Sequence, residues 1–194
     1  VLNGVANSIE TDSLQFIYLL MHEAGKTIQD AHDEIREAVD FLRYYAQQSA
    51  SLNSKSSQLG PTGEDNILEY SPKGLVACIS PWNFPLAITL GQIAAALVTG
   101  NTVIAKASEE TSLIAFKAIS LFFDHGLPKD ALHLLLGNGE LGQAIISSQP
   151  LDLVVFTGSL STAKNIHNNL AAKPGKIVPL IAETGGLNSM VVDS

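Results

Sequence analysis

Hydrophobic positions change their spacing near residue 74, and this change divides the chain into two parts. Before residue 74, apolar residues recur every three or four positions, which is the spacing of one face of a helix. After it, short apolar runs alternate with longer segments of helical spacing. Such alternation is typical of α/β proteins with a parallel sheet. The pattern therefore predicts a Rossmann-like parallel sheet with helices on both faces.

The first part predicts two packing helices, a loop and a short strand. The first helix is closed by Gly25, and the second begins at Thr27, where Asp30 completes a capping-box-like pair. Residues 49–63 have a loop-like composition, and residues 66–70 predict a strand set apart from the main sheet. That strand pairs with another subunit or forms a surface hairpin. The apolar stripes are Leu14, Ile17, Tyr18, Met21 and Ala24 in the first helix, and Ile28, Ala31, Ile35, Val39, Leu42 and Tyr45 in the second.

The second part predicts an ordered series of strands and helices. Gly100 and Gly126 stand at expected helix ends, where a left-handed residue closes the last turn. Strands are expected at residues 75–79, 102–105, 132–136, 153–156, 177–181 and 189–192. Helices are expected at residues 86–99, 112–125, 140–148 and 161–171.

Composition and charge narrow the class of protein. Of the 194 residues, 46% are hydrophobic and 15% are charged, which indicates one globular domain. The net charge of −8 and the scattered basic residues do not support a nucleic-acid partner. No apolar run reaches the length of a membrane span. The single cysteine, Cys78, excludes an internal disulfide, so we expect a reducing compartment.

Asn83 lies in the sequence SPWNFP, directly after a predicted strand. Pro81 and Pro85 restrict the backbone on either side and stiffen this loop. A carboxamide held at a strand end can donate its N–H group to a developing oxyanion. An Asn in a turn can also cap the following helix, and both roles remain open.

Lys106 and Glu109, in the sequence AKASEE, follow the next strand. An ammonium and a carboxylate can together bond the two hydroxyls of a ribose. A carboxylate also disfavours a ribose that carries a 2′-phosphate, which favours NAD over NADP. The alternative is a surface ion pair at the start of a helix.

Two glycine-containing loops are candidates for contact with a cofactor. Residues 156–159, Phe-Thr-Gly-Ser, end a strand and open a helix, whose free amides and serine hydroxyl suit a diphosphate. This loop lacks the G-x-G-x-x-G fingerprint of dinucleotide-binding loops. A second close-approach loop contains Gly137, Gly139 and Gly142.

Glu183 precedes Thr184, Gly185 and Gly186 at the end of a predicted strand. A carboxylate there would lose part of its hydration, which suits a general base, although a turn-capping Glu is the alternative. The histidines lack metal-ligand spacing, so no metal site is expected. Cys78 lies inside an apolar strand and is expected to be an inert buried thiol.

Four motifs, SPWNFP, GNTVIAKASEE, VVFTGS and AETGG, occur in this order. Their order and spacing resemble the aldehyde dehydrogenase superfamily over about residues 14–194. Within it, the segments EAGKTIQDAHDEIREAVDFLRYYAQQ, GPTGEDN, CISPWNFPLAI and VPLIAETGG most resemble the L-glutamate γ-semialdehyde (Δ1-pyrroline-5-carboxylate) dehydrogenase module of the proline utilization A branch. Members of that branch are bifunctional bacterial enzymes with a separate flavin-dependent proline dehydrogenase.

The resemblance implies a role for each matched position. Asn83 would supply the oxyanion-hole amide, and Glu183 would be the general base. Lys106 and Glu109 would hold the adenosine ribose of NAD. The other cofactor contacts would be Ile79, Ser80, Pro81, Trp82, Phe156 and Thr157 along the groove, Gly139 and Gly142 near the adenine, and Gly158 and Ser159 at the pyrophosphate. The reaction would be thiol attack on the aldehyde, hydride transfer to NAD and hydrolysis of a thioester.

The resemblance also implies what lies outside this chain. The catalytic cysteine of the family follows the Glu-Thr-Gly-Gly motif and lies beyond residue 194, so we expect this chain alone to be inactive. Residues 1–194 would form part of the NAD-binding domain, and residues 60–72 would belong to an arm of a homo-oligomer in the bacterial cytoplasm. FAD would belong to the separate proline dehydrogenase domain. Two departures from the family pattern, Ala163 and Ala107, replace a frequent Gly and a frequent Pro.

Two other readings of the sequence remain open. One is an aldehyde dehydrogenase of the same superfamily with another substrate, because the substrate-anchoring loops lie outside the chain. The other is a non-catalytic module that binds a nucleotide or a partner. Asn83 and Glu183 together disfavour that module, since binding alone needs neither residue.

Overall fold

A parallel sheet of five strands forms the centre of the computed structural model, which describes residues 1–148, 150–186 and 189–193. The strand order is β5-β4-β3-β6-β7. In β3, Cys78 is paired with Ala105 of β4 on one side and with Val155 of β6 on the other. The strands are β3 (Leu75–Ile79), β4 (Thr102–Lys106), β5 (Leu132–Leu134), β6 (Leu153–Gly158) and β7 (Leu180–Thr184). The predicted parallel α/β sheet is confirmed.

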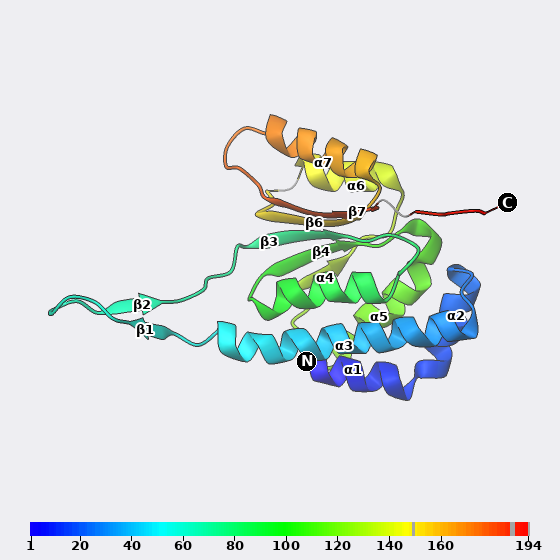
Figure 1. Cartoon of the computed structure of the whole chain (residues 1–194), viewed down its shortest axis with the longest axis horizontal. Helices are drawn as coiled ribbons and strands as arrows, with labels where there is room; N and C mark the ends of the chain where they lie inside the picture. The colour runs from blue at the N-terminus through cyan, green and yellow to red at the C-terminus, as the bar shows by residue number, and fades with distance from the viewer. Residues whose placement is uncertain (149, 187–188, 194) are drawn as a thin grey trace.

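Helices cover both faces of this sheet (Figure 1). On one face lie α4 (Ala87–Val98) and α5 (Ser112–Asp124), the latter preceded by the short 3-10 helix η1 (Glu109–Thr111). On the other face lie α6 (Gly139–Ser148) and α7 (Leu160–Ala172). Parallel strands require such crossover connections. Gly100 and Gly126 have φ values of +83° and +88°, as their predicted place at helix ends requires.

The side chains on the two faces of β3 belong to two separate hydrophobic cores, because successive side chains of a strand point to opposite faces. Val76 and Cys78 pack on the side of α4 and α5. Ala77 and Ile79 pack on the side of α6 and α7. All four side chains are buried, which explains why the strand reads as a continuous apolar run.

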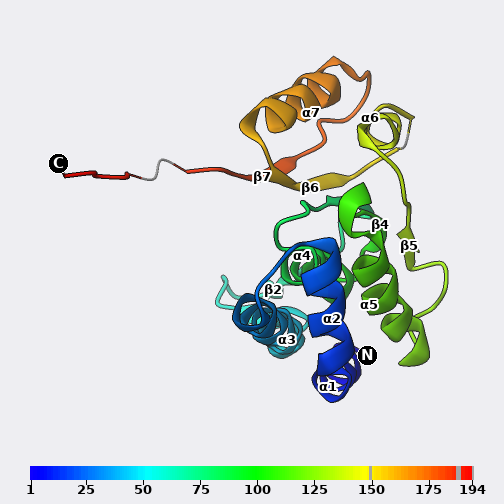
Figure 2. The ribbon, with the colours of Figure 1, turned by 90° about the vertical axis from the view of Figure 1, so that its right-hand side faces the viewer.

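Three N-terminal helices form a further layer outside α4 and α5 (Figure 2). They are α1 (Leu2–Thr11), α2 (Ser13–Glu23) and α3 (Ile28–Leu52). The predicted cap of α3 is confirmed, since the Asp30 amide donates to Thr27 Oγ1 at 3.1 Å. Helix α1 is not among the elements predicted from the sequence, although Leu2, Val5, Ala6 and Ile9 have helical spacing and are buried.

Several predicted details are wrong. In α2 the buried residues are Phe16 and Leu20, whereas Leu14 and Tyr18 are exposed, because this helix is apolar on most of its sides and the period alone does not select a face. In α3, Ile28 is exposed, so its stripe begins at Ala31. The strand expected at 177–181 lies three residues later, as β7. β5 is shorter than expected.

Residues 189–193 do not form the strand that was predicted there. They extend away from the sheet (Figure 1), where the described part of the chain offers them no neighbouring strand. Their apolar side chains are therefore exposed, as at Met190 and Val191. An apolar run forms a strand only where a partner supplies hydrogen bonds.

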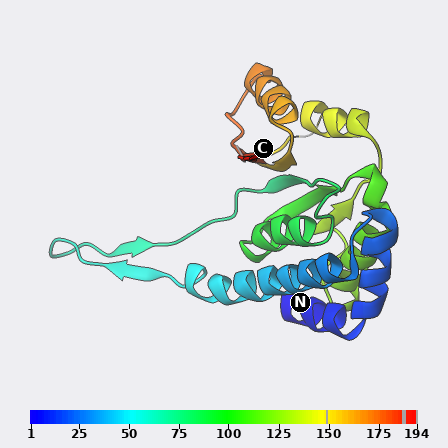
Figure 3. The same ribbon diagram turned by 45° about the vertical axis from the view of Figure 1, so that its right-hand side comes forward.

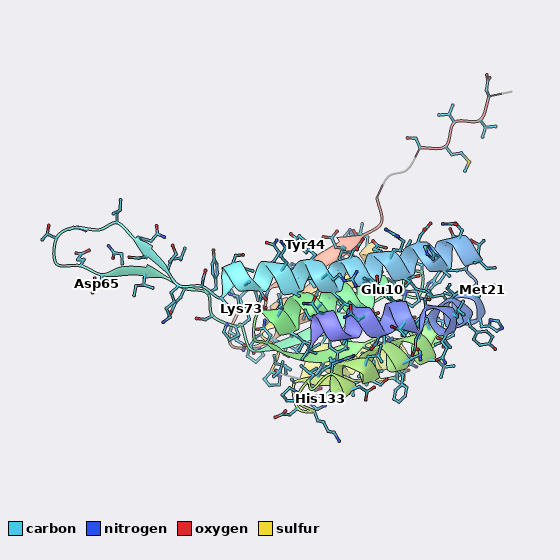
Figure 4. The ribbon with its side chains drawn as sticks, turned by 90° about the horizontal axis from the view of Figure 1, so that it is seen from below. Glu10, Met21, Tyr44, Asp65, Lys73 and His133 are labelled. Atoms are coloured by element: carbon cyan, nitrogen blue, oxygen red, sulfur yellow. The ribbon has the colours of Figure 1, made fainter. Side chains whose placement is uncertain are left out.

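The expected loop at residues 49–63 is partly helix and partly a hairpin. Helix α3 continues to Leu52, and β1 (Ser56–Gln58) pairs antiparallel with β2 (Asn66–Leu68). This β1–β2 arm projects from the body (Figure 3), and Asp65 lies on it, away from the packed helices (Figure 4). Its apolar side chains are exposed, among them Leu59, Ile67 and Tyr70.

Candidate functional site

The carboxyl ends of β3 and β6 meet at the point where the chain changes direction across the sheet. From β3 the chain moves outward to β4 and β5, and it then returns to β6 beside β3. The crossover helices on the two sides of this point therefore cover opposite faces of the sheet, and they diverge between β3 and β6. In doubly wound sheets, ligands bind at this switch point, outside the carboxyl ends of the strands.

A groove with a volume of about 430 Å³ lies at this point, and we call it the strand-end groove. Every predicted cofactor-binding residue except Glu109 lines it. These residues come from the ends of β3, β4 and β6, the loop after β3, α6 and the start of α7. They are Ile79, Ser80, Pro81, Trp82, Lys106, Gly139, Gly142, Phe156, Thr157, Gly158 and Ser159.

Side chains of α6 and α7 also line the groove, and the sequence motifs do not predict them. These lining residues are Gln143, Ile146, Thr162, Asn165 and Ile166. Gln143 and Ile146 follow Gly139 and Gly142 on one face of α6, so helical spacing could have revealed them. Residues 137–142, GNGELG, also have the G-x-G-x-x-G spacing after β5, and this spacing is a further signal for the groove.

The N-terminus of α7 gives the groove an anion-binding end. Ser159 caps this helix, and its Oγ accepts a hydrogen bond from the Thr162 amide at 3.2 Å. A helix N-terminus presents unpaired amides and partial positive charge. At position 158 a Cβ atom would lie 2.6 Å from the Phe156 ring, so a side chain there would fit only if the Phe156 ring moved. The loop is therefore suited to a negatively charged group such as a diphosphate.

Lys106 is buried at the end of β4 and forms an ion pair with Glu109. Its Nζ lies 3.0 Å from Glu109 Oε2, and the side chains are 8% and 46% exposed. The pair therefore is not a free surface contact, although Glu109 itself lies outside the groove lining. An ammonium has three N–H donors, so Lys106 can bond Glu109 and a hydroxyl in the groove together.

The charge of Glu109 is stabilised at neutral pH. A hydrogen bond from its own backbone amide and a second one from Lys106 lower the pKa of this carboxyl. A carboxyl with a lowered pKa contributes fully to stability at pH values above its ordinary pKa. It loses this contribution as the pH falls through the lowered pKa. The ion pair thus persists through the physiological range.

A second hollow, of about 640 Å³, brings the two predicted catalytic residues together. Asn83 comes from the loop after β3, and Glu183 comes from the end of β7. Thr157 and Gly158 line both this hollow and the strand-end groove, so the two spaces adjoin. Thr157 is directly opposite Glu183 in the β6–β7 register, which directs both side chains to one face of the sheet.

The exposure of Glu183 differs from the expectation. Its side chain is exposed, because β7 is an edge strand of the described sheet. The partial loss of hydration that was expected there is therefore absent among the described residues. Asn83 is also exposed and faces the same hollow.

Gln92 of α4 supports this region and had no signal in the sequence analysis. Its Nε2 donates to Thr157 Oγ1 at 3.0 Å and to the Ile79 carbonyl at 3.4 Å. The side chain is buried between α4 and the sheet. It therefore holds the Thr157 hydroxyl at the wall shared by the two spaces.

Cys78, the single cysteine of the chain, is buried inside β3. Burial raises the pKa of its thiol to about 12. A protonated thiol is not a nucleophile, so the predicted inert character is supported by its environment. Within the described residues, no group of three or more His, Cys, Asp or Glu side chains could hold a metal ion. In the same part of the chain, no helix has the length and apolarity to cross a membrane.

These features define a doubly wound α/β protein with adjoining spaces at its strand ends. The aldehyde dehydrogenase family model matches residues 1–194, and the chain belongs to this family. It is 49% identical over 179 residues to bifunctional protein PutA of Rhizobium meliloti, covering 91% of this chain and 13% of that protein. It is 39% identical over 183 residues to 1-pyrroline-5-carboxylate dehydrogenase 1 of Halalkalibacterium halodurans, covering 92% of this chain and 36% of that protein.

Solved structures share the fold. A crystal structure of bifunctional proline utilization A superposes with a TM-score of 0.93 and 51% identity, over 95% of this chain and 19% of that one. Betaine aldehyde dehydrogenase of Staphylococcus aureus, in complex with NAD+, gives a TM-score of 0.88 and 28% identity, over 95% of this chain and 37% of that one. The chain therefore spans well under half of the length of these relatives.

The environment of Cys78 predicts its reactivity. In the folded chain at pH 8, iodoacetamide should leave Cys78 unmodified, because the thiol is buried and protonated. In urea it should label at the rate of a free cysteine. Mass spectrometry of the alkylated chain measures both, and fast labelling of the folded chain would contradict the burial described here.

Proposed function

We propose that this chain is the cofactor-binding part of an NAD-dependent dehydrogenase that oxidises L-glutamate γ-semialdehyde to glutamate. The observation that carries the proposal is that a groove suited to a dinucleotide adjoins the hollow that Asn83 and Glu183 share. Membership of the aldehyde dehydrogenase family supports the oxidation of an aldehyde. The names of the PutA and 1-pyrroline-5-carboxylate dehydrogenase relatives support the choice of substrate.

The residues that line the strand-end groove support NAD as the cofactor. Lys106 and Glu109 would bond the adenosine ribose, and Ser159 with the first amides of α7 would bind the pyrophosphate. Gly139 and Gly142 leave α6 open, since no atom lies within 4 Å of a Cβ built at either position. The complex of the S. aureus relative with NAD+ supports this cofactor. NAD, when bound, accepts the hydride of the aldehyde.

Asn83 and Glu183 would act on the substrate in the hollow. The Asn83 carboxamide would donate to the oxygen of the aldehyde as negative charge develops on it. Glu183 would take a proton from the water that releases the product, a role that its contact with solvent allows. The nucleophilic thiol must come from a part of the protein outside residues 1–194, because Cys78 is buried and protonated.

The likeness to bifunctional PutA supports a wider proposal for the complete protein. It would be a bacterial cytoplasmic enzyme with a separate proline dehydrogenase part that binds FAD. The flavin absorbance of the purified complete protein tests this proposal, and a protein without flavin would refute it.

The β1–β2 arm would join this subunit to another copy. Its exposed apolar residues have no packing role in the body, and a hairpin held by a neighbour is more stable than an isolated one. Ile67→Asp should therefore lower the mass of the complete protein in sedimentation analysis. Glu64→Gln, a change on the same arm that adds no charge, is the matched control. An unchanged mass for Ile67→Asp would show that the arm makes no such contact.

Replacement of Glu109 tests the ribose contact. Glu109→Ser removes the bond to the ribose and the repulsion of a 2′-phosphate, while Lys106 remains to attract that phosphate. The ratio of NAD to NADP affinity should fall by roughly tenfold or more, which corresponds to about 1.4 kcal/mol. Calorimetric titration of the chain with each nucleotide measures the ratio. Glu110→Ser, one residue along, should not change it, and an unaltered ratio for Glu109→Ser would refute the ribose role.

Replacement of Asn83 tests the oxyanion contact. In the complete dehydrogenase, Asn83→Ala should lower kcat by about 10²- to 10³-fold, the typical loss for one oxyanion donor. The affinity for NAD should be retained, because Asn83 does not line the strand-end groove. Steady-state kinetics with the semialdehyde measures the loss, with Asn168→Ala on the exposed face of α7 as control. Residues 1–194 alone should give no turnover. Full activity of the Asn83→Ala variant would show that Asn83 is a turn residue without a catalytic role.

A further inference from the structure

Glu34 of α3 is a buried carboxylate that lies against the start of α4. Only 1% of the residue is exposed. Its Oε1 accepts hydrogen bonds from the Leu86 amide at 2.8 Å and from the Ala87 amide at 3.2 Å. Leu86 is the N-cap residue of α4 and has no side-chain acceptor of its own. Glu34 of α3 thus caps α4 from a different part of the chain.

Lys26 connects this carboxylate to the loop that holds Asn83. Its Nζ lies 2.8 Å from Glu34 Oε2, and its side chain is 10% exposed. The same Nζ lies 3.9 Å from the centroid of the Phe84 ring, which is a cation–π distance. Phe84 directly follows Asn83. Lys26, Glu34, Asn83 and Phe84 also line a common hollow.

The loop from Ser80 to Leu86 is consequently held at both ends. At its start, Ser80 Oγ and Thr89 Oγ1 are 2.6 Å apart, and the Ser80 amide donates to the Lys106 carbonyl at 3.2 Å. At its end, Glu34 binds the Leu86 amide. The exposed Asn83 side chain lies between these anchors, so its position depends on them.

A gain in stability is a weak explanation for a buried ion pair at this place. Taking two charges out of water is costly, and apolar replacements are often equally stable. The pair does fix the geometry of the loop, because Glu34 binds two backbone amides and Lys26, bound to Glu34, contacts one aromatic ring. Catalytic hydrogen-bond donors need such fixed positions, since a displacement of 1 Å can cost about 100-fold in rate.

We propose that Lys26 and Glu34 are positioning residues that hold the Asn83 carboxamide in its catalytic orientation. The proposal rests on the oxyanion role proposed for Asn83. Lys26 acts on the loop through Phe84, and Glu34 acts on it through the start of α4. Neither side chain lines the strand-end groove, so both are separate from cofactor binding.

The test uses substitutions at both residues in the complete dehydrogenase. Glu34→Gln and Lys26→Met should each lower kcat by about 10- to 100-fold, with the affinity for NAD unchanged. Lys26→Arg keeps the positive charge and the contact with Phe84, so this variant should retain most of the wild-type kcat. If Glu34→Gln does not fold, Lys26→Met keeps the Glu34 cap and still tests the pair.

Glu23→Gln is the matched control. Glu23 of α2 caps α5 in the same way, with its carboxylate oxygens 2.9 Å from the Leu113 amide and 2.8 Å from the Ile114 amide. Glu23 lines neither the strand-end groove nor the hollow that Asn83 and Glu183 share. Glu23→Gln should lower the free energy of unfolding and leave kcat unchanged.

Double substitutions separate positioning from a general structural effect. In an Asn83→Ala background, Glu34→Gln should cause no further loss of kcat, because its effect passes through the missing amide. An additional loss equal to that of the single variant would overturn the proposal. Full activity in Glu34→Gln and Lys26→Met, with low activity in Asn83→Ala, would overturn the positioning role alone. Full activity in Asn83→Ala would overturn the oxyanion role and this inference with it.

Discussion

Strand β3 is paired in parallel on both of its sides, and this pairing determines how the other elements are arranged. A parallel pair cannot be closed by a tight turn, so each neighbour of β3 must be reached through a crossover helix. The chain meets this requirement by building β4 and β5 on one side and β6 and β7 on the other. Because every strand runs in the same direction, all the loops that leave their carboxyl ends meet at one edge. The candidate site is a consequence of that arrangement.

The two-residue period of β6 then sends neighbouring side chains to opposite faces of the sheet. Phe156 points to the side of α6 and α7, where it packs in the core below the strand-end groove. Thr157 is bonded by Gln92 of α4 and stands opposite Glu183. Residues adjacent in sequence thus point to opposite faces of the sheet, and Thr157, unlike Phe156, also lines the Asn83–Glu183 hollow. The N-terminal helices are part of this arrangement, because α3 supplies the carboxylate that caps α4.

Much of the fold could be predicted from the sequence because the relevant signals are local. Buried parallel strands read as apolar runs, and Gly100 and Gly126 mark helix ends by their positive φ values. The errors arise where local signals are ambiguous or incomplete. Helix α2 is apolar on most sides, so its helical period predicts Leu14 in the core, whereas Phe16 is the buried residue. Residues 189–192 have strand-like composition, but their pairing depends on a neighbour that composition does not reveal.

The candidate site, like the fold, could be predicted only where its signals are local. Motifs at strand ends identified the groove and the Asn83–Glu183 hollow, although the helix faces of α6 and α7 were missed. The supports of the site could not be found in this way, because Glu34 and Leu86 are 52 positions apart and Gln92 and Thr157 are 65 apart. Such contacts depend on how helices dock, and single residues inside amphipathic segments carry no local trace of them.

We propose that the ends of β3, β4 and β6 bind NAD in a fixed orientation beside Asn83. The decisive experiment is a crystal structure of the complete protein with NAD. It should show a ribose at Lys106 and Glu109, the diphosphate at the N-terminus of α7, and the nicotinamide toward Thr157. A nucleotide bound at another surface, or in the groove with its diphosphate away from Ser159, would refute this mode of binding.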